Sequence, residues 1–223
     1  MSVWPAIWLT LQLAAISTVI LLIIALPLGW WLATTTARTT PLFEAITALP
    51  LVLPTTVLGF YLLILKSPDS AIGGPRARAT GDTLALSFTG LVIASVVYSL
   101  PFAVQPMQSA FMTIPKNTLE AARTLGATSR DAFFSVSLPM ARRGFITAAV
   151  LSFAHTIGEF GVVLMVGGNI PGKTRVISIE IFNAVETLDY RTAHVVSFWL
   201  LVFSLAVLTL VYFLNRRGGA RLG

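Results

Sequence analysis

The sequence predicts an all-α integral membrane protein with about five transmembrane helices. Of its 223 residues, 56% are hydrophobic and only 11% are charged. The mean hydropathy is +0.84. In soluble globular proteins about a quarter of the residues are charged. The charged residues of this chain are too few to cover the surface of a soluble protein. Several long apolar runs, separated by short polar segments, complete the argument for helices that cross a bilayer.

Five runs are long enough to cross the hydrocarbon core, which takes about 20 residues. Residues 1–223 therefore form one transmembrane domain, with spans expected at 7–33, 44–65, 86–111, 144–166 and 193–214. The first run has no charge between Ile7 and Ala33 and no basic residue before it, unlike a cleavable signal peptide. Trp30, Trp31 and then Arg38 are typical of an interfacial belt followed by a cytoplasmic anchor. We expect this run to be a retained helix.

Basic residues predict the orientation. With the N-terminus outside, the inner segments hold nine of the fifteen, namely Arg38, Lys116, Arg123, Arg130, Arg142, Arg143, Arg216, Arg217 and Arg221. The outer segments hold Lys66, Arg76, Arg78, Lys173, Arg175 and Arg191. This bias predicts an outer N-terminus and a cytoplasmic C-terminus. The basic residues are scattered and not interleaved with aromatics, so we expect no nucleic acid partner; membrane lipid is the expected surrounding.

Prolines recur within or beside these runs, at Pro27, Pro50, Pro54, Pro101 and Pro106. Each lacks an amide hydrogen and is expected to kink or interrupt its helix. In residues 49–59, two of these prolines lie one turn apart and precede Thr55, Thr56 and Gly59. Two interpretations remain open here. The segment is either a bent packing helix whose threonines bond back to it, or a broken helix lining a route through the membrane.

The polar segment between the third and fourth spans, approximately 113–140, predicts two short helices. Asn117 and Glu120 have the spacing of a capping box, and Gly126 lies where a left-handed residue ends a helix. Ser129 with Asp131 predicts the second start, and Pro139 lies near its end. A narrow apolar stripe follows the first helix, formed by Leu119, Ala122 and Leu125.

This segment resembles the EAA loop in permease subunits of ABC importers of type I, through Glu120-Ala121-Ala122, Gly126 and Leu138-Pro139. The resemblance implies the type I permease fold and a cytoplasmic coupling helix that docks on a separate ATPase subunit. The docking residues it implies are Glu120, Ala121, Ala122 and Gly126, with Arg123 and Leu125 as neighbours. From spacing alone, Glu120 could simply cap the helix and the alanines could simply favour it.

The fourth span contains an acid, which is costly in a membrane and therefore a functional candidate. His155 and Glu159 are four residues apart, so they are expected to share a helix face and could pair. The alternatives are an interhelical hydrogen bond, a metal site with His194, or an intramembrane enzyme; we expect no metal, cofactor or catalytic residue. The pore or gate candidates are Pro50, Pro54, Thr55, Thr56, Gly59, Glu159 and Gly161.

The glycine-rich stretch around Glu159, from Gly158 to Gly161, resembles a segment in the permeases of molybdate and sulfate importers, and residues 169–174 are similar to their outer loop. The resemblance covers residues 10–214 and favours molybdate or tungstate over sulfate or thiosulfate. It implies a homodimer in the bacterial inner membrane, two cytoplasmic ATPase subunits and an extracytoplasmic substrate-binding protein. The chain would then be a transport subunit rather than an enzyme.

Overall fold

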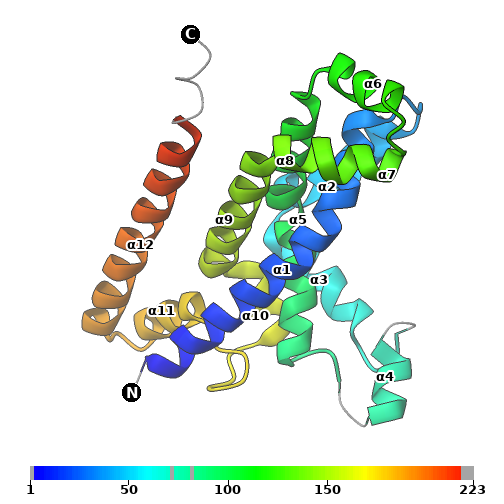
Figure 1. Ribbon diagram of the computed structural model, residues 1–223. Coiled ribbons are helices and arrows are strands. Elements are labelled where there is room, and N and C mark those ends of the chain that lie inside the picture. The colour runs from blue at the N-terminus through cyan, green and yellow to red at the C-terminus, as the bar shows by residue number, and fades with distance from the viewer. Residues whose placement is uncertain (1–2, 71–72, 81–82, 217–223) are drawn as a thin grey trace.

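The computed structural model describes residues 3–70, 73–80 and 83–216, and all regular structure in these ranges is helical. The predicted basic residues Arg217 and Arg221 lie outside the described residues. Figure 1 labels the helices. In chain order they are α1 Trp4–Thr34, α2 Thr40–Val52, α3 Thr55–Leu65, α4 Gly73–Thr80, α5 Phe88–Met112, α6 Lys116–Thr124, α7 Ser129–Ala132, the π-helical turn η1 Phe133–Ser137, α8 Leu138–Met140, α9 Arg142–Gly158, α10 Gly161–Gly167, α11 Ile177–Glu186 and α12 Tyr190–Arg216.

Three helices are each long and apolar enough to cross a membrane, namely α1, α5 and α12. Two further spans are each a pair of helices joined at a sharp bend. The bend measures 109° between α2 and α3 and 62° between α9 and α10. Counting each pair once gives five spans, which confirms the expected all-α architecture. The span expected at 144–166 is broken, and so is the span at 44–65, for which a broken helix was one of the two open interpretations.

The first break follows from proline chemistry. Leu53 ends α2 in an extended conformation, and Pro54, also extended, precedes α3. A residue before proline is disfavoured in the helical region, which ends α2 there. The 109° angle favours a broken helix over a gently bent one. Pro27 in α1 and the two prolines of α5 lie inside continuous helices, so they do not interrupt their spans.

The second break corrects a prediction about a residue pair. Helix α9 ends at Gly158, and Glu159 is extended, with φ −67° and ψ 132°. Glu159 therefore does not continue the helical face of His155, and the expected pairing on one face is wrong. The Ser178 hydroxyl of α11 donates to the Glu159 carbonyl oxygen at 2.5 Å, which satisfies backbone freed by the break.

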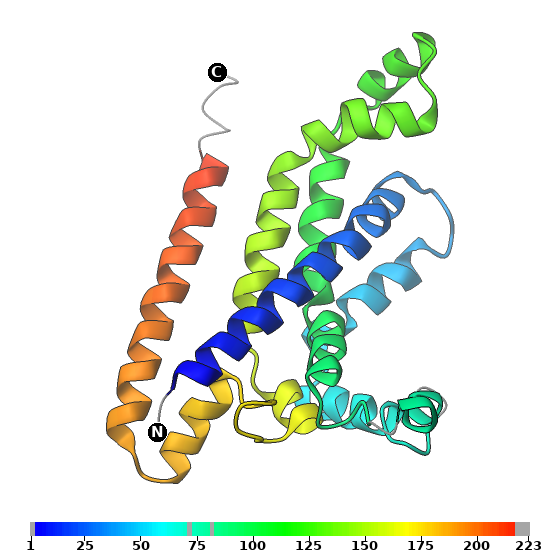
Figure 2. The ribbon, with the colours of Figure 1, turned by 60° about the horizontal axis from the view of Figure 1, so that its bottom comes forward.

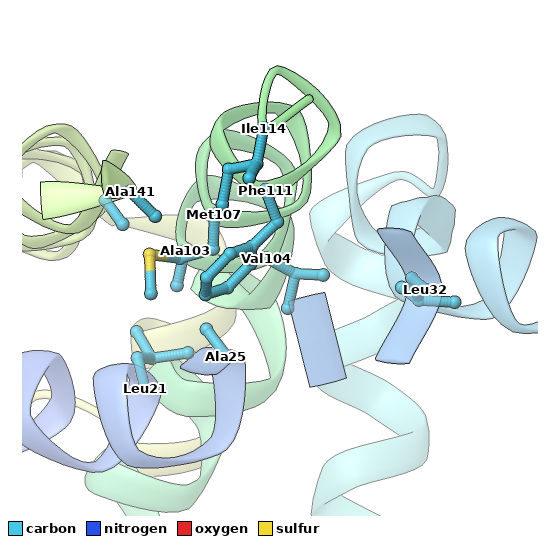
Figure 3. Packing of buried hydrophobic residues seen from close by; sticks show 10 residues of the cluster. Leu21, Ala25, Leu32, Ala103, Val104, Met107, Phe111, Ile114 and Ala141 are labelled. Atoms are coloured by element: carbon cyan, nitrogen blue, oxygen red, sulfur yellow. The ribbon is translucent and has the colours of Figure 1, made fainter. Parts of the chain in front are cut away.

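The core lies where α1, α5 and α9 cross (Figure 3). Leu21 and Ala25 of α1 pack against Ala103, Val104 and Met107 of α5, and all five are fully buried. Small residues let these helices approach closely. At Gly29 of α1, for example, a Cβ would lie only 2.9 Å from the Met107 Cβ. These close contacts give the bundle a rigid centre.

Two helices, α4 and α11, were not predicted. Helix α11 runs antiparallel to the start of α12 and leads into it through a short turn (Figure 2). Helix α12 stands apart from α1 and α5 in both views. Only 11% of its most apolar window is buried within the chain. The bundle therefore has a compact part and an outlying helix.

Candidate coupling loop and membrane cavity

Helix α6 lies at one end of the molecule, beyond the ends of α1 and α5 (Figure 1). It begins at Lys116, one residue earlier than expected, because Pro115 is extended and serves as the N-cap. Asn117 lies within the first turn, and the helix start has no side-chain cap. The predicted capping box of Asn117 and Glu120 is therefore wrong. A box requires its first member to precede the helix.

The end of α6 agrees with prediction. Gly126 has φ +89°, in the left-handed region that favours glycine. Its amide donates to the Arg123 carbonyl oxygen at 2.9 Å, and the Ala127 amide donates to that of Ala122 at 3.0 Å. These bonds satisfy carbonyl groups that the helix end leaves free. The chain then turns sharply into α7.

The second helix carries the capping box that the first one lacks. Thr128 is its N-cap, and the Asp131 amide donates to the Thr128 hydroxyl at 3.2 Å. The Thr128 amide donates back to the Asp131 carboxylate at 3.1 Å. Hydrogen bonds from the Thr128 side chain and backbone hold the pKa of Asp131 below its ordinary value. Ser129 is the first helical residue, and the helical path continues through η1 and α8, which contains Pro139.

The predicted docking residues are accessible on α6, which has no buried residue. Leu125 is 88% exposed, which is unusual for a leucine, and little of it is covered by the part of the chain that the structure describes. Ala121 is exposed and Ala122 half-buried. Glu120 and Arg123 face a cavity of about 510 Å³ between α6 and the end of α1. The helix thus presents an open small-residue surface with an apolar side chain at its end.

A second cavity, of about 580 Å³, lies beside both helix breaks. Four of the seven predicted pore residues line it, namely Thr55, Thr56, Glu159 and Gly161. They reach it from α3 and from the junction of α9 and α10. The structure therefore brings together residues that are about 100 positions apart in the sequence. We call this hollow the break cavity.

The other three pore candidates lie outside its lining. Pro50 is buried in α2, and Pro54 is the N-cap of α3. Gly59 instead brings α3 against α10, where a Cβ would lie 2.7 Å from the Met165 Cβ. A Cβ on Gly161 would likewise meet the Thr55 side chain. Glycine on each short helix therefore allows the two to touch.

Polar residues that the sequence did not identify as pore candidates also line the break cavity, namely Tyr98 of α5 and His155 of α9. The His155 Nδ1 lies 2.9 Å from the Ser99 hydroxyl, which is 3.3 Å from the Thr156 hydroxyl. Phe102 stacks on the imidazole at 3.8 Å. Tyr98, Ser99 and Phe102 lie within one apolar span, and no pattern in the sequence marked them as neighbours of His155 or as part of a cavity.

Glu159 is 3% exposed. Lys66 interacts with its carboxylate electrostatically. However, neither carboxylate oxygen meets hydrogen-bond geometry with a partner among the described residues. Lys66 was expected in an outer segment but is 2% exposed, and its ammonium donates to the Gly90 carbonyl oxygen at 2.6 Å. An acidic and a basic side chain are thus both buried, a rare arrangement within an apolar bundle.

Residues 25–218 match a family described as the binding-protein-dependent transport system inner membrane component. The chain belongs to this family. It is therefore a multi-pass subunit of an ABC transport system, a transport component rather than an enzyme, with ATP hydrolysis on a separate subunit. That assignment sets aside the intramembrane enzyme.

Three relatives of this chain are permease proteins for molybdenum or for sulfate. The chain is 53% identical over 207 residues to the molybdenum transport system permease protein ModB of Azotobacter vinelandii, covering 93% of this chain and 92% of the relative. Identity to ModB of Escherichia coli K12 is 34%, covering 82% and 80%. Identity to the sulfate transport system permease protein CysT of Salmonella typhimurium is 32%, covering 95% and 76%.

Solved structures share the fold. A chain of a bacterial alginate ABC transporter, in complex with an alginate-bound periplasmic protein, matches with a TM-score of 0.75 at 16% identity, covering 96% of this chain and 78% of that one. A chain of the inward-facing MetNI methionine ABC transporter matches with a TM-score of 0.69 at 20% identity, covering 96% and 99%. These likenesses support the predicted type I ABC importer permease fold.

Proposed function

We propose that this chain is the channel-forming permease subunit of an ATP-driven importer for molybdate or tungstate. The observation that carries the proposal is the 53% identity to a molybdenum permease over nine-tenths of both chains. The chemically similar sulfate is the second candidate, supported by 32% identity to a sulfate permease. The molybdenum permease is both more similar and closer in length, so we favour molybdate.

The proposed unit is a homodimer that encloses the path, with two ATPase subunits on the cytoplasmic side and one binding protein outside. Helix α6 and the end of α12 lie at one end of the molecule, while α1 begins at the other (Figure 1). This arrangement supports an outer N-terminus and a cytoplasmic C-terminus in the bacterial inner membrane. The break cavity opens at the protomer surface, where a second copy would close it.

We assign ATPase coupling to α6 and its terminating turn. Alanine at 121 and 122 permits close approach of a partner backbone, and the exposed Leu125 offers an apolar contact. Gly126 makes the rigid joint to α7, so that a push on α6 would reach α9 through α7, η1 and α8. The assigned residues are Glu120, Ala121, Ala122, Arg123, Leu125 and Gly126.

We assign the gate to the two helix breaks. Short helices that end within a membrane supply free backbone groups and a point of flexure, whereas a continuous helix supplies neither. Helices α3 and α10 contact each other through Gly59 and Gly161, so movement of one would displace the other. The remaining assigned residues are Pro50, Pro54, Thr55, Thr56 and Glu159.

The deciding experiment reconstitutes the chain with its ATPase and binding protein in liposomes and measures ATP-dependent uptake. We expect molybdate and tungstate to be accumulated in preference to sulfate. Preferential sulfate uptake would identify the second candidate, and the absence of ATP-dependent oxyanion uptake would refute the proposal.

The same preparation tests the coupling surface. Leu125→Ser removes an exposed apolar contact without disturbing the core, so it should lower the amount of ATPase that copurifies with the permease and lower uptake in proportion. Leu188→Ser is the matched control, because Leu188 is 70% exposed in the turn before α12. Equal ATPase recovery with both variants would remove α6 from the contact.

A further inference from the structure

We propose that the break cavity is a transient binding site for a tetrahedral oxyanion, held by the neutral hydrogen-bond donors Thr55, Thr56, Tyr98 and His155. The inference rests on the proposed function and deepens it, because it names the groups that the anion would meet between the binding protein and the cytoplasm. Two of these four residues, Tyr98 and His155, were not among the predicted pore residues.

The lining has donors without cations. Its polar side chains are the hydroxyls of Thr55, Thr56 and Tyr98 and the His155 imidazole; Glu159 also borders the cavity, but both of its carboxylate oxygens are buried, and no lysine or arginine lines it. Among the described residues, no hydrogen bond engages the hydroxyls of Thr55, Thr56 or Tyr98, so all three are free to bind a ligand. They project from α3 and α5, and the imidazole comes from α9, so an anion would be approached from several helices.

His155 is held in place as a donor. The Ser99 hydroxyl lies 2.9 Å from its Nδ1 and 3.3 Å from the Thr156 hydroxyl. If Thr156 donates to Ser99 and Ser99 donates to Nδ1, the proton of the neutral ring is on Nε2, which is then the ring's donor. Stacking on Phe102 fixes the plane of the ring. Ser99 is accordingly a positioning residue.

The one acid beside the cavity is shielded from it. Both Glu159 carboxylate oxygens are buried, so the surface that an anion would touch consists of hydroxyls, imidazole and apolar groups. A buried acid next to an anion path would otherwise repel the ligand.

Neutral donors suit a site that must release its ligand. A dianion leaving water needs hydrogen bonds to replace its hydration, and hydroxyl and imidazole donors supply them. Arginine or lysine in the same place would hold the dianion much more strongly through charge-assisted bonds. The break cavity therefore lowers the barrier to passage without trapping the ion.

The test uses the complete transporter in liposomes, loaded with molybdate-bound binding protein, and compares three forms. Thr56→Val combined with Tyr98→Phe removes two hydroxyls while keeping side-chain shape, and should lower molybdate uptake per ATP hydrolysed by about tenfold. Thr56→Ser retains the hydroxyl and should lose much less uptake than the double variant. Thr56 is exposed, and Tyr98→Phe keeps the ring that packs against the buried cluster of Leu62, Ala94, Val162 and Val166.

Each outcome decides a separate point. Unchanged uptake in the double variant would overturn the oxyanion site while leaving the proposed function intact. A loss in Thr56→Ser equal to that in the double variant would assign the effect to packing and also overturn the site. If the unsubstituted transporter fails to accumulate molybdate, the proposed function itself falls.

Discussion

At the scale of single residues, Asp131 and Thr128 fix the start of the second coupling-loop helix. Each donates a backbone amide to the side chain of the other. Both groups are in the aqueous loop, where the bonds compete with water. The pair nevertheless favours the ionised carboxylate, because the charged form accepts both bonds from Thr128 more strongly than the neutral form does.

We expect the pKa of Asp131 to lie below the ordinary value of an aspartate and to return toward it in Thr128→Val. Because the folded pKa is the lower one, the capping contribution is complete above the unfolded pKa. It is lost as the pH falls through the folded value. Titration of the Asp131 carboxyl carbon by NMR measures this pKa in the unsubstituted protein and in Thr128→Val. Thr128→Ser, which keeps the hydroxyl, is the control; an unshifted Asp131 in the unsubstituted protein would contradict the assignment.

Local residue patterns in this loop were predicted unequally. Gly126 could be predicted because a left-handed helix end strongly favours glycine whatever surrounds it. Asn117 misled because Pro115 begins the helix earlier, and the rule for capping boxes does not fix which residue precedes the first turn. The N-cap of the second helix is Thr128, whereas the sequence predicted the helix start at Ser129. Serine and threonine are both favoured at this position, so the sequence could not distinguish the two neighbours.

At the scale of helices, α5 and α9 approach each other through Gly144. A Cβ at this position would contact the Ala110 side chain and lie 2.8 Å from the Pro106 carbonyl oxygen. Proline at 106 removes an amide hydrogen from α5, and the absence of a side chain on Gly144 lets α9 lie against that stretch. This contact couples the coupling-loop end of α9 to the core.

Gly144→Ala should destabilise the protein by about 1–3 kcal/mol, because the new methyl group would overpack backbone that cannot easily move. Gly158→Ala on the same helix is the matched control. Its Cβ would meet nothing within 4 Å, and alanine favours helix by about 0.5–1 kcal/mol. Thermal unfolding in one detergent compares them. A similar midpoint for both variants would show that α5 and α9 are less tightly packed than described.

Helix breaks were predictable only where the sequence marks them. Pro54 marks the first, although sequence alone left a bent helix as an alternative. The second lies within an apolar run that hydropathy reads as continuous, and Glu159 there was expected to stay helical beside His155. The burial of Lys66 was not predictable either, because its partner is a backbone carbonyl from a distant helix.

At the scale of the whole molecule, the five apolar runs correspond to three long helices and two bent helix pairs, because the thickness of a bilayer fixes the length of a crossing. The sequence could not show that two crossings consist of half-helices, nor that their breaks meet at one cavity. The proposed orientation rests on the excess of basic residues in the inner segments.

The chain has no cysteine, so each introduced cysteine is a unique label. Expressed without partner subunits, Lys173→Cys should react with an impermeant maleimide in intact spheroplasts. Leu125→Cys should react only in inside-out vesicles. Both positions are exposed, so accessibility reports sidedness rather than burial. The reverse pattern would invert the proposed topology and remove α6 from the cytoplasm.

Because α12 lies apart from the compact bundle, much of its apolar surface must contact lipid or detergent rather than the rest of the chain. An apolar groove between α1 and α12, lined by residues such as Leu11 and Phe203, has almost no polar surface. Acyl chains or another polypeptide must fill it, since water would not. The position of α12 is therefore stabilised largely by its contacts with the surrounding bilayer. A change in lipid thickness or chain order would act on this helix before it reached the interior.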